Sequence, residues 1–210
     1  LANTLDELHR YYSPSGLAAP FERQALVKLR FVCGDRTLGK QVEAHRDAFV
    51  YSDRPWDLAA ALSLRRQQIK ELTEPGQVNV KYSPGGIVDI EYAAQYLQVM
   101  HGHALSDLRT PNTLEALAAT ERHRILPAGE ARALRDAYLF LRSVIDALRI
   151  VRGHAKDLVL PDIGSDEFIF LARRIGYTED DWRAGRDEWH DGRGRHSERG
   201  ITKLTTTGRH

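Results

Sequence analysis

Residues 81–97 read Lys-Tyr-Ser-Pro-Gly-Gly-Ile-Val-Asp-Ile-Glu-Tyr-Ala-Ala-Gln-Tyr-Leu, so a glycine pair leads directly into a patterned segment. On a helical wheel, drawn at about 100° per residue, the apolar residues of this segment share one arc, which predicts a helix packed against a core. The residues of this arc are Ile87, Ile90, Ala94 and Leu97. Glu91 falls inside or beside the arc, whereas Asp89 points the opposite way. Because a carboxylate on a buried face is costly unless it is paired, we expect Glu91 to have a dedicated partner or to line a site.

Capping residues, prolines and glycines divide the rest of the chain into further helices. The predicted helices span residues 4–12, 20–33, 37–50, 53–73, 86–100, 110–120, 129–152, 165–175 and 178–189. Residues 78–82 alternate in the manner of a short strand or extended segment. The helix over 129–152 carries two adjacent apolar stripes, which is typical of the centre of a bundle. The sequence therefore predicts an all-α fold, a helical bundle with a short extended segment near residues 78–82.

Residues 191–210 differ in character from the rest of the chain. They contain four glycines, three consecutive threonines and almost no apolar periodicity. Such a segment cannot bury enough apolar surface to offset the entropy lost when it becomes ordered. We therefore expect one helical domain over residues 1–190 and a disordered tail over 191–210.

Composition narrows the class of protein. The chain has 210 residues, 42% of them hydrophobic, which is enough for one substantial core. Thirty Lys and Arg residues balance 29 Asp and Glu residues, so we expect no nucleic-acid partner. No apolar run is long enough to span a membrane and no signal peptide is visible. The single cysteine excludes an internal disulfide and suits a reducing cytoplasm, so we expect a cytoplasmic protein.

Four separated segments carry a resemblance to a known family. Residues 81–95 look like the signature that opens a central helix in glutamine synthetase adenylyltransferases. Residues 21–30, followed by Gly34-Asp35, are similar to the first long helix after that family's nucleotidyltransferase domain, and residues 108–117 and 137–142 fit in the right order. The resemblance covers roughly residues 5 to 177. It identifies the chain as the helical domain that follows a nucleotidyltransferase domain, cut from a longer protein.

The resemblance implies the activity of that longer enzyme. The family transfers AMP from ATP to a tyrosine of glutamine synthetase and removes it by phosphorolysis, in the control of nitrogen metabolism by the PII signal protein. It implies ATP and Mg²⁺ for the intact enzyme, and glutamine synthetase, PII and an upstream nucleotidyltransferase domain as partners. Whether the parent half adds or removes AMP stays open. Two alternatives also stay open: the helical domain of a PII uridylyltransferase-like enzyme, and a stand-alone helical regulatory or protein-interaction module.

The chain lacks the motif that such catalysis requires. Nucleotidyltransferases of this type need a glycine turn, about ten further residues, and then paired acidic residues on a strand that hold Mg²⁺. Here Gly85-Gly86 is followed by Asp89 and Glu91 too soon and on a predicted helix. We therefore expect no catalytic residue in this chain, no cofactor in the fragment alone, and an inactive fragment.

The loop that opens the signature helix is a candidate phosphate site. Gly85 and Gly86 give the backbone freedom, Lys81 supplies a cation, and free N–H groups at a helix start favour an anion. The alternative is that the glycine pair only makes a tight turn into the helix. The family resemblance places this loop near the catalytic domain.

The remaining candidate residues each have a structural alternative. Glu91 either lines a nucleotide cleft or forms a buried ion pair with an arginine, the candidates being Arg23, Arg30, Arg142 and Arg149. Asp89 either stabilises the helix N-terminus or meets a partner across a domain interface. Lys28, with Arg30 beside it, either extends its ammonium to water from an apolar face or directs it toward a triphosphate in a cleft. His101 and His103 have a spacing that a helix cannot use for one metal, so we assign no metal site.

Overall fold

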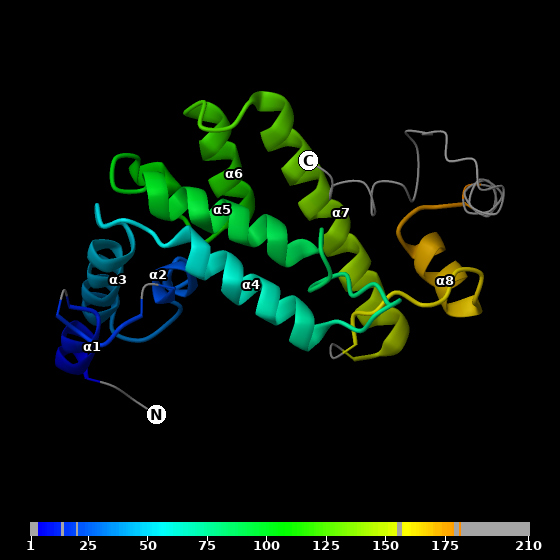
Figure 1. Cartoon of the computed structure of the whole chain (residues 1–210), viewed down its shortest axis with the longest axis horizontal. Helices are drawn as coiled ribbons and strands as arrows, with labels where there is room; N and C mark the ends of the chain where they lie inside the picture. The colour runs from blue at the N-terminus through cyan, green and yellow to red at the C-terminus, as the bar shows by residue number, and fades with distance from the viewer. Residues whose placement is uncertain (1–3, 14, 20, 155–156, 179–180, 182–210) are drawn as a thin grey trace. The chain divides into compact units, whose positions relative to one another are not determined.

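The computed structural model describes residues 4–13, 15–19, 21–154, 157–178 and 181. Within these residues the fold is all-α (Figure 1), as the sequence predicts. The helices are α1 (Leu5–Tyr11), α2 (Glu22–Leu26), α3 (Arg36–Val50), α4 (Leu58–Leu72), α5 (Ile87–His101), α6 (Thr113–Arg122), α7 (Ala128–Arg152) and α8 (Asp166–Arg174). A short 3-10 helix, η1 (Ser106–Leu108), precedes α6.

The chain divides into two compact units. The first unit consists of the residues up to Arg66 together with Glu91–Ala133, and the second of Gln67–Ile90 together with the residues from Leu134 onward. The boundaries therefore fall inside α4, α5 and α7. The single bundle expected over residues 1–190 stays a prediction, and the tail expected over 191–210 lies outside the described residues, as does most of the helix expected at 178–189.

Several helix starts agree with the sequence, but α4 begins at Leu58 rather than at residue 53, and the Asp57 carboxylate accepts from the Ala60 N–H there. The Thr4 side chain accepts from the Glu7 backbone while the Glu7 carboxylate accepts from Thr4, so a complete capping box opens α1. Asp35, Asn112 and Ser165 cap α3, α6 and α8 in the same way, each through its side-chain oxygen. These helix starts depend only on residues close in sequence, and that explains why they are predictable.

The second helix is much shorter than predicted, five residues rather than the span 20–33. Beyond Leu26 the backbone hydrogen bonds span three residues instead of four, and the Leu29 N–H donates to the Leu26 carbonyl. The backbone groups that follow are then satisfied from α3: Arg46 donates to the Leu29 carbonyl, and the Phe31 N–H donates to Glu43. Because α3 side chains form hydrogen bonds with these backbone groups, α2 ends early.

The segment at 78–82 forms a single bridge rather than a strand. Asn79 pairs with Val159 in antiparallel fashion. The Val80 N–H donates to the Leu158 carbonyl at 2.9 Å, and the Leu160 N–H donates to the Val78 carbonyl at 2.8 Å. The extended pairing is therefore shorter than the predicted 78–82, because residues 80–82 turn, with the Ser83 N–H donating to the Asn79 carbonyl. Its partner lies after α7 in the second unit.

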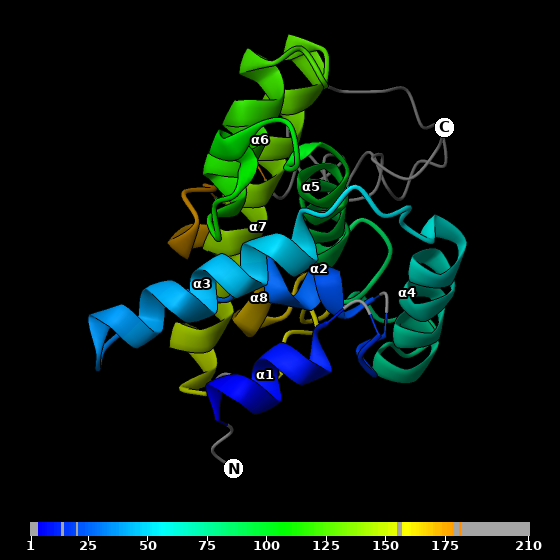
Figure 2. The same ribbon diagram turned by 90° about the vertical axis from the view of Figure 1, so that its left-hand side faces the viewer.

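The core of the first unit lies where α3 meets the turn after α2 and the end of α5. Val27, Val50, Tyr51 and Val99 are buried there, with Leu26, Phe49 and Trp56 packed against them. The helix α1 has no buried residue and lies against α2 and α3 (Figure 2). It is thus the most loosely attached helix that this unit contains in the described part of the chain.

Arg23 closes the end of α3. Its side chain is 4% exposed and donates to the carbonyls of Val50, Ser52 and Arg54 at 2.9–3.0 Å. These carbonyls follow the last turn of α3, where backbone acceptors lack helical partners and a cation is favoured by the helix dipole. A buried arginine therefore acts as the C-terminal cap of this helix.

We expect Arg23→Met to lower the free energy of unfolding by about 3 kcal/mol, because methionine fills the space and leaves the buried carbonyls without donors. Urea denaturation followed by circular dichroism measures the loss. Arg30→Met is the matched control, since Arg30 is exposed, and it should change stability by less than about 0.5 kcal/mol. Equal losses in the two variants would contradict the capping role.

Candidate functional site

Lys28 lies in a polar cluster of the first unit, just after α2. Its Nζ donates to the Pro111 carbonyl at 3.0 Å and to the Thr113 hydroxyl at 2.7 Å. Thr113 is buried and begins α6. Burial lowers the pKa of the Lys28 ammonium, and the negative charge of Glu91 acts in the opposite direction. The prediction that Lys28 extends its charge to water is therefore wrong, because its ammonium binds the segment that leads into α6.

Glu91 is half-buried and belongs to the same electrostatic environment as Lys28. The arginines proposed as partners of Glu91 either make other contacts or are exposed to solvent. Arg23 binds carbonyls at the end of α3, Arg142 and Arg149 lie 4.0 and 3.4 Å from Asp146, and Arg30 is exposed. Lys28, which the sequence analysis did not consider as a partner of Glu91, is a cation whose pKa responds to the charge of Glu91.

Two buried glutamine side chains lie on the same face of α5 as Glu91. Gln95 accepts from the Gln24 side chain at 2.9 Å, and both residues are less than 9% exposed. Gln98 is 1% exposed and donates to the carbonyls of Leu108 and Thr110 at 2.6 Å. Glu91, Gln95 and Gln98 follow one another at spacings of four and three, the period of one helix face. That period was the available signal for Gln95, which the sequence analysis did not single out.

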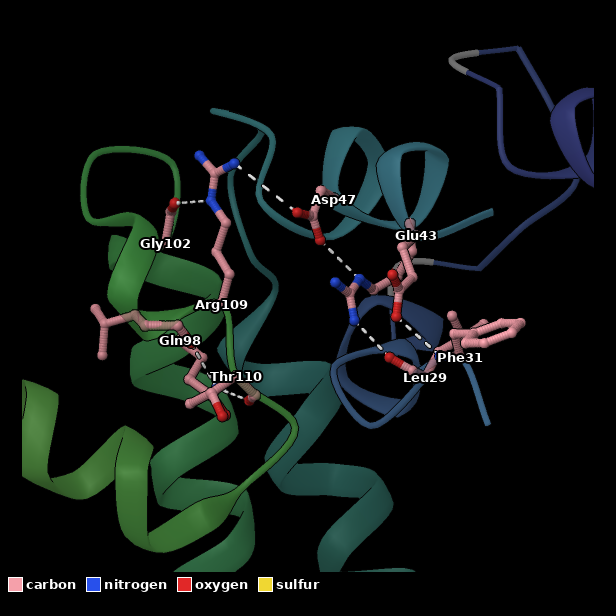
Figure 3. Close-up of polar contacts among 10 residues, drawn as sticks. Leu29, Phe31, Glu43, Asp47, Gln98, Gly102, Arg109 and Thr110 are labelled. Carbon is pink, nitrogen blue, oxygen red and sulfur yellow. Dashed lines mark hydrogen bonds and ion pairs between the residues drawn. The ribbon is translucent and has the colours of Figure 1, made fainter. Parts of the chain in front are cut away.

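A second network of charges crosses the first unit (Figure 3). Arg46 on α3 donates to the Leu29 carbonyl and, at 2.7 Å, to the carboxylate of Asp47. The other oxygen of Asp47 lies 4.0 Å from Arg109. Arg109 in turn donates to the carbonyls of Gly102 and His103, just beyond α5. The network therefore joins the turn after α2 to the end of α5 through α3.

Tyr51 lies beneath this network. The Arg109 guanidinium stands 5.5 Å from the centre of the Tyr51 ring. Burial raises the pKa of Tyr51 to about 12, and its hydroxyl has no hydrogen-bond partner among the described residues. A Cβ at Gly102 would come within 2.4 Å of the same ring, so this close packing requires glycine. Tyr51 is thus a core residue that stays un-ionised.

The loop before α5 belongs to the second unit and is closed rather than open to an anion. The Gly85 N–H donates to the Asp89 carboxylate at 2.7 Å, and the Gly86 N–H donates to the Ser83 carbonyl at 2.8 Å. The next two N–H groups donate to the carbonyls of Val80 and Lys81. The expectation of free N–H donors at this helix start is therefore wrong, and phosphate binding by Gly85 and Gly86 loses the donors on which it depended.

Each glycine of the pair has a structural reason. Gly85 has φ +78°, a conformation that side-chain-bearing residues rarely adopt. Gly86 is buried, and a Cβ there would meet the carbonyl oxygens of Val80, Lys81 and Ser83 at 2.8–2.9 Å. Asp89 accepts from Gly85 at the start of α5, which agrees with the stabilising alternative for that residue. The pair makes a packed turn.

Of the seven residues named from the sequence, the structure joins Gly85 to Asp89 by a hydrogen bond, and the charge of Glu91 acts on the pKa of Lys28. Arg30 is exposed, and the half-exposed Lys81 places its Nζ 4.7 Å from the Tyr82 ring. Within the described ranges, no group of three or more His, Cys, Asp or Glu side chains could hold a metal ion. None of the described helices is both long and apolar enough to cross a membrane.

Comparison with known proteins gives consistent matches. Residues 58–201 match the model of a family described as GlnD PII-uridylyltransferase. The bifunctional glutamine synthetase adenylyltransferase/adenylyl-removing enzyme of Pseudomonas putida is 32% identical over 90% of this chain and 20% of its own length. The enzymes of the same name from Streptomyces coelicolor and Mycolicibacterium smegmatis are each 31% identical, over 84% and 86% of this chain and 18% of their own lengths. The chain thus spans about a fifth of the length of these relatives.

We expect Gly86→Ala to destabilise the protein by about 2 kcal/mol, because the added methyl group meets backbone carbonyls that cannot move aside. Thermal unfolding monitored by circular dichroism measures it. Gly129→Ala on α7 is the control, since a Cβ there meets no atom within 4 Å, and it should be neutral or slightly stabilising. A Gly86→Ala protein as stable as the wild type would refute the packed turn.

We expect Glu91→Gln to lower the pKa of Lys28 further, because the carboxylate charge that favours the ammonium is removed while burial remains. Nitrogen-detected NMR titration of the lysine Nζ groups measures this shift. Glu71→Gln, an exposed change on α4, should leave the Lys28 titration unchanged. A Lys28 pKa that stays constant in Glu91→Gln would remove the electrostatic link between the two residues.

Proposed function

This chain belongs to the family described as GlnD PII-uridylyltransferase and is related to part of the glutamine synthetase adenylyltransferases, and we propose that it is the helical domain of such an adenylyltransferase. The observation that carries the proposal is the relationship to the adenylyltransferases, which extends over 84–90% of the chain. In the intact enzyme, AMP would be transferred from ATP, with Mg²⁺, to a tyrosine of glutamine synthetase, and removed again under the control of PII.

Within that enzyme we propose a supporting rather than a reacting role for this domain. The hydrogen bonds of Lys28 and Gln98 fix the segment between α5 and α6 from inside, and the hydrogen bond between Gln24 and Gln95 joins α2 to α5. We propose that this internal polar face keeps the domain rigid while an upstream nucleotidyltransferase domain supplies the metal-binding carboxylates. Arg30, which is exposed in the first unit, is a proposed contact for nucleotide phosphates, and the half-exposed Lys81 of the second unit is a separate one.

A second candidate is the helical domain of a PII uridylyltransferase, which would transfer UMP to the PII protein. The matching family model, by its description, favours this candidate. The relatives named as adenylyltransferases favour the first. The two candidates share a fold and differ in nucleotide and protein substrate, so one assay of paired reactions separates them.

The test uses the longer protein of which this chain is proposed to be a part. It is incubated with glutamine synthetase and radiolabelled Mg·ATP, and in parallel with PII and radiolabelled Mg·UTP. Label on glutamine synthetase supports the first candidate. Label on PII alone supports the second and overturns the first, and label on neither overturns both.

We expect the 210-residue chain alone to label neither protein, because it lacks the spaced pair of strand carboxylates that hold Mg²⁺ in this class of enzyme. The same two radiolabel assays measure this, with the longer protein as the positive control. Transfer of AMP to glutamine synthetase by the isolated chain would show that catalytic groups lie within it, contrary to the supporting role.

A further inference from the structure

The helix α1 is attached to α3 largely through two histidines. The rings of His9 on α1 and His45 on α3 stack with centroids 4.2 Å apart and planes tilted by 35°. His45 also makes a hydrogen bond to the backbone carbonyl of Leu8, in α1. Since α1 contributes no buried side chain of its own, it is held by such ring contacts with α3 and by the hydrogen bonds of Tyr11 and Tyr12 to Glu22 of α2.

The second nitrogen of the His45 ring has no acceptor to which an additional proton could be donated. Its Nε2 atom is buried and has no hydrogen-bond partner among the described residues. A proton added there would create a buried donor without an acceptor, next to the stacked ring of His9. The docked arrangement therefore favours a neutral His45.

The other titratable groups around this contact are engaged elsewhere or exposed. Glu7 on α1 accepts from Thr4, Glu22 on α2 accepts from the hydroxyls of Tyr11 and Tyr12, Glu43 on α3 accepts from Phe31, and Asp47 pairs with Arg46. Asp6, Arg10 and Lys40 are exposed on α1 and α3. The carboxylates of this interface therefore have other partners than a protonated His45.

We propose that α1 is a pH-sensitive latch, docked on α3 while His45 is neutral and released when His45 takes up a proton. Release separates Tyr12 from Phe49 of α3, whose rings now lie 4.9 Å apart. It therefore exposes the face of the Phe49 ring that Tyr12 contacts at neutral pH.

The direction of the pH dependence follows from the titration of His45. Burial, and then the neighbouring His9, lower the pKa of His45 below its ordinary value of 6.5, while the Leu8 carbonyl acts the other way. A base whose pKa is lowered by docking binds protons less well when docked, so docking is strongest above the ordinary pKa. It weakens as the pH falls through about 6.5 toward the lowered value.

Hydrogen exchange of the α1 amides, observed by NMR, tests the latch. Protection factors, corrected for the intrinsic effect of pH, should fall by up to about tenfold between pH 7.5 and pH 5.5, since 5.5 lies one unit below the ordinary pKa. In His45→Gln, whose amide keeps a donor for Leu8 but does not titrate, they should be equal at the two pH values. His103→Gln, an exposed control, should behave as wild type.

The reciprocal measurement is the titration of His45 itself. Leu8→Pro breaks α1, which loss of protection in its amides verifies, and the pKa of His45 should then return toward its ordinary value. The proposal is overturned by wild-type protection that does not change with pH, by a His45→Gln protein that loses protection as wild type does, or by a His45 pKa that stays low after α1 has melted.

Discussion

Backbone carbonyl groups that lack a helical partner are the constraint on which the first unit depends. Its helices are short and its connections are numerous, so many acceptors lie at helix ends. Buried acceptors of this kind are costly unless a donor reaches them. Long side chains supply those donors: Arg23 at the end of α3, Arg109 beyond α5, and Lys28 before α6. The hydrogen bonds of Arg23 and Lys28 also join segments distant in sequence, so the same bonds satisfy the carbonyls and fix the connections.

Cations suit this task better than neutral donors. A guanidinium offers several N–H groups in a fixed plane, which is why Arg23 reaches three carbonyl groups at the end of α3 at once. Its charge is also favoured by the dipole of the helix that it closes. The interior of this unit therefore contains basic residues that bind backbone carbonyl groups, Arg23 and Lys28 among them, and the charge of Glu91 acts on the pKa of Lys28.

What could be predicted from the sequence follows the same division between local and distant interactions. The all-α class and the starts of α1, α3 and α8 rest on neighbours three residues apart, and they are confirmed. The length of α2 depends on Arg46 and Glu43, which lie more than ten residues away and carry no local signal. At the candidate site, Glu91 was found because its position on the wheel conflicts with its charge. The closure of the Gly85-Gly86 loop was missed, because the pattern shows backbone freedom but not where the N–H groups point.

The bridge between Asn79 and Val159 has a consequence for how the chain is made. The two residues are separated by α5, α6 and the whole of α7, so the partner of residues 78–80 leaves the ribosome long after them. During synthesis the first unit has every one of its segments available once Ala133 has emerged, whereas the second unit waits for residues 158–160. The turn that opens α5 is thus incomplete while its own helix is already available for packing. A pause in translation between these points would prolong an intermediate with the edge of residues 78–80 exposed to other chains.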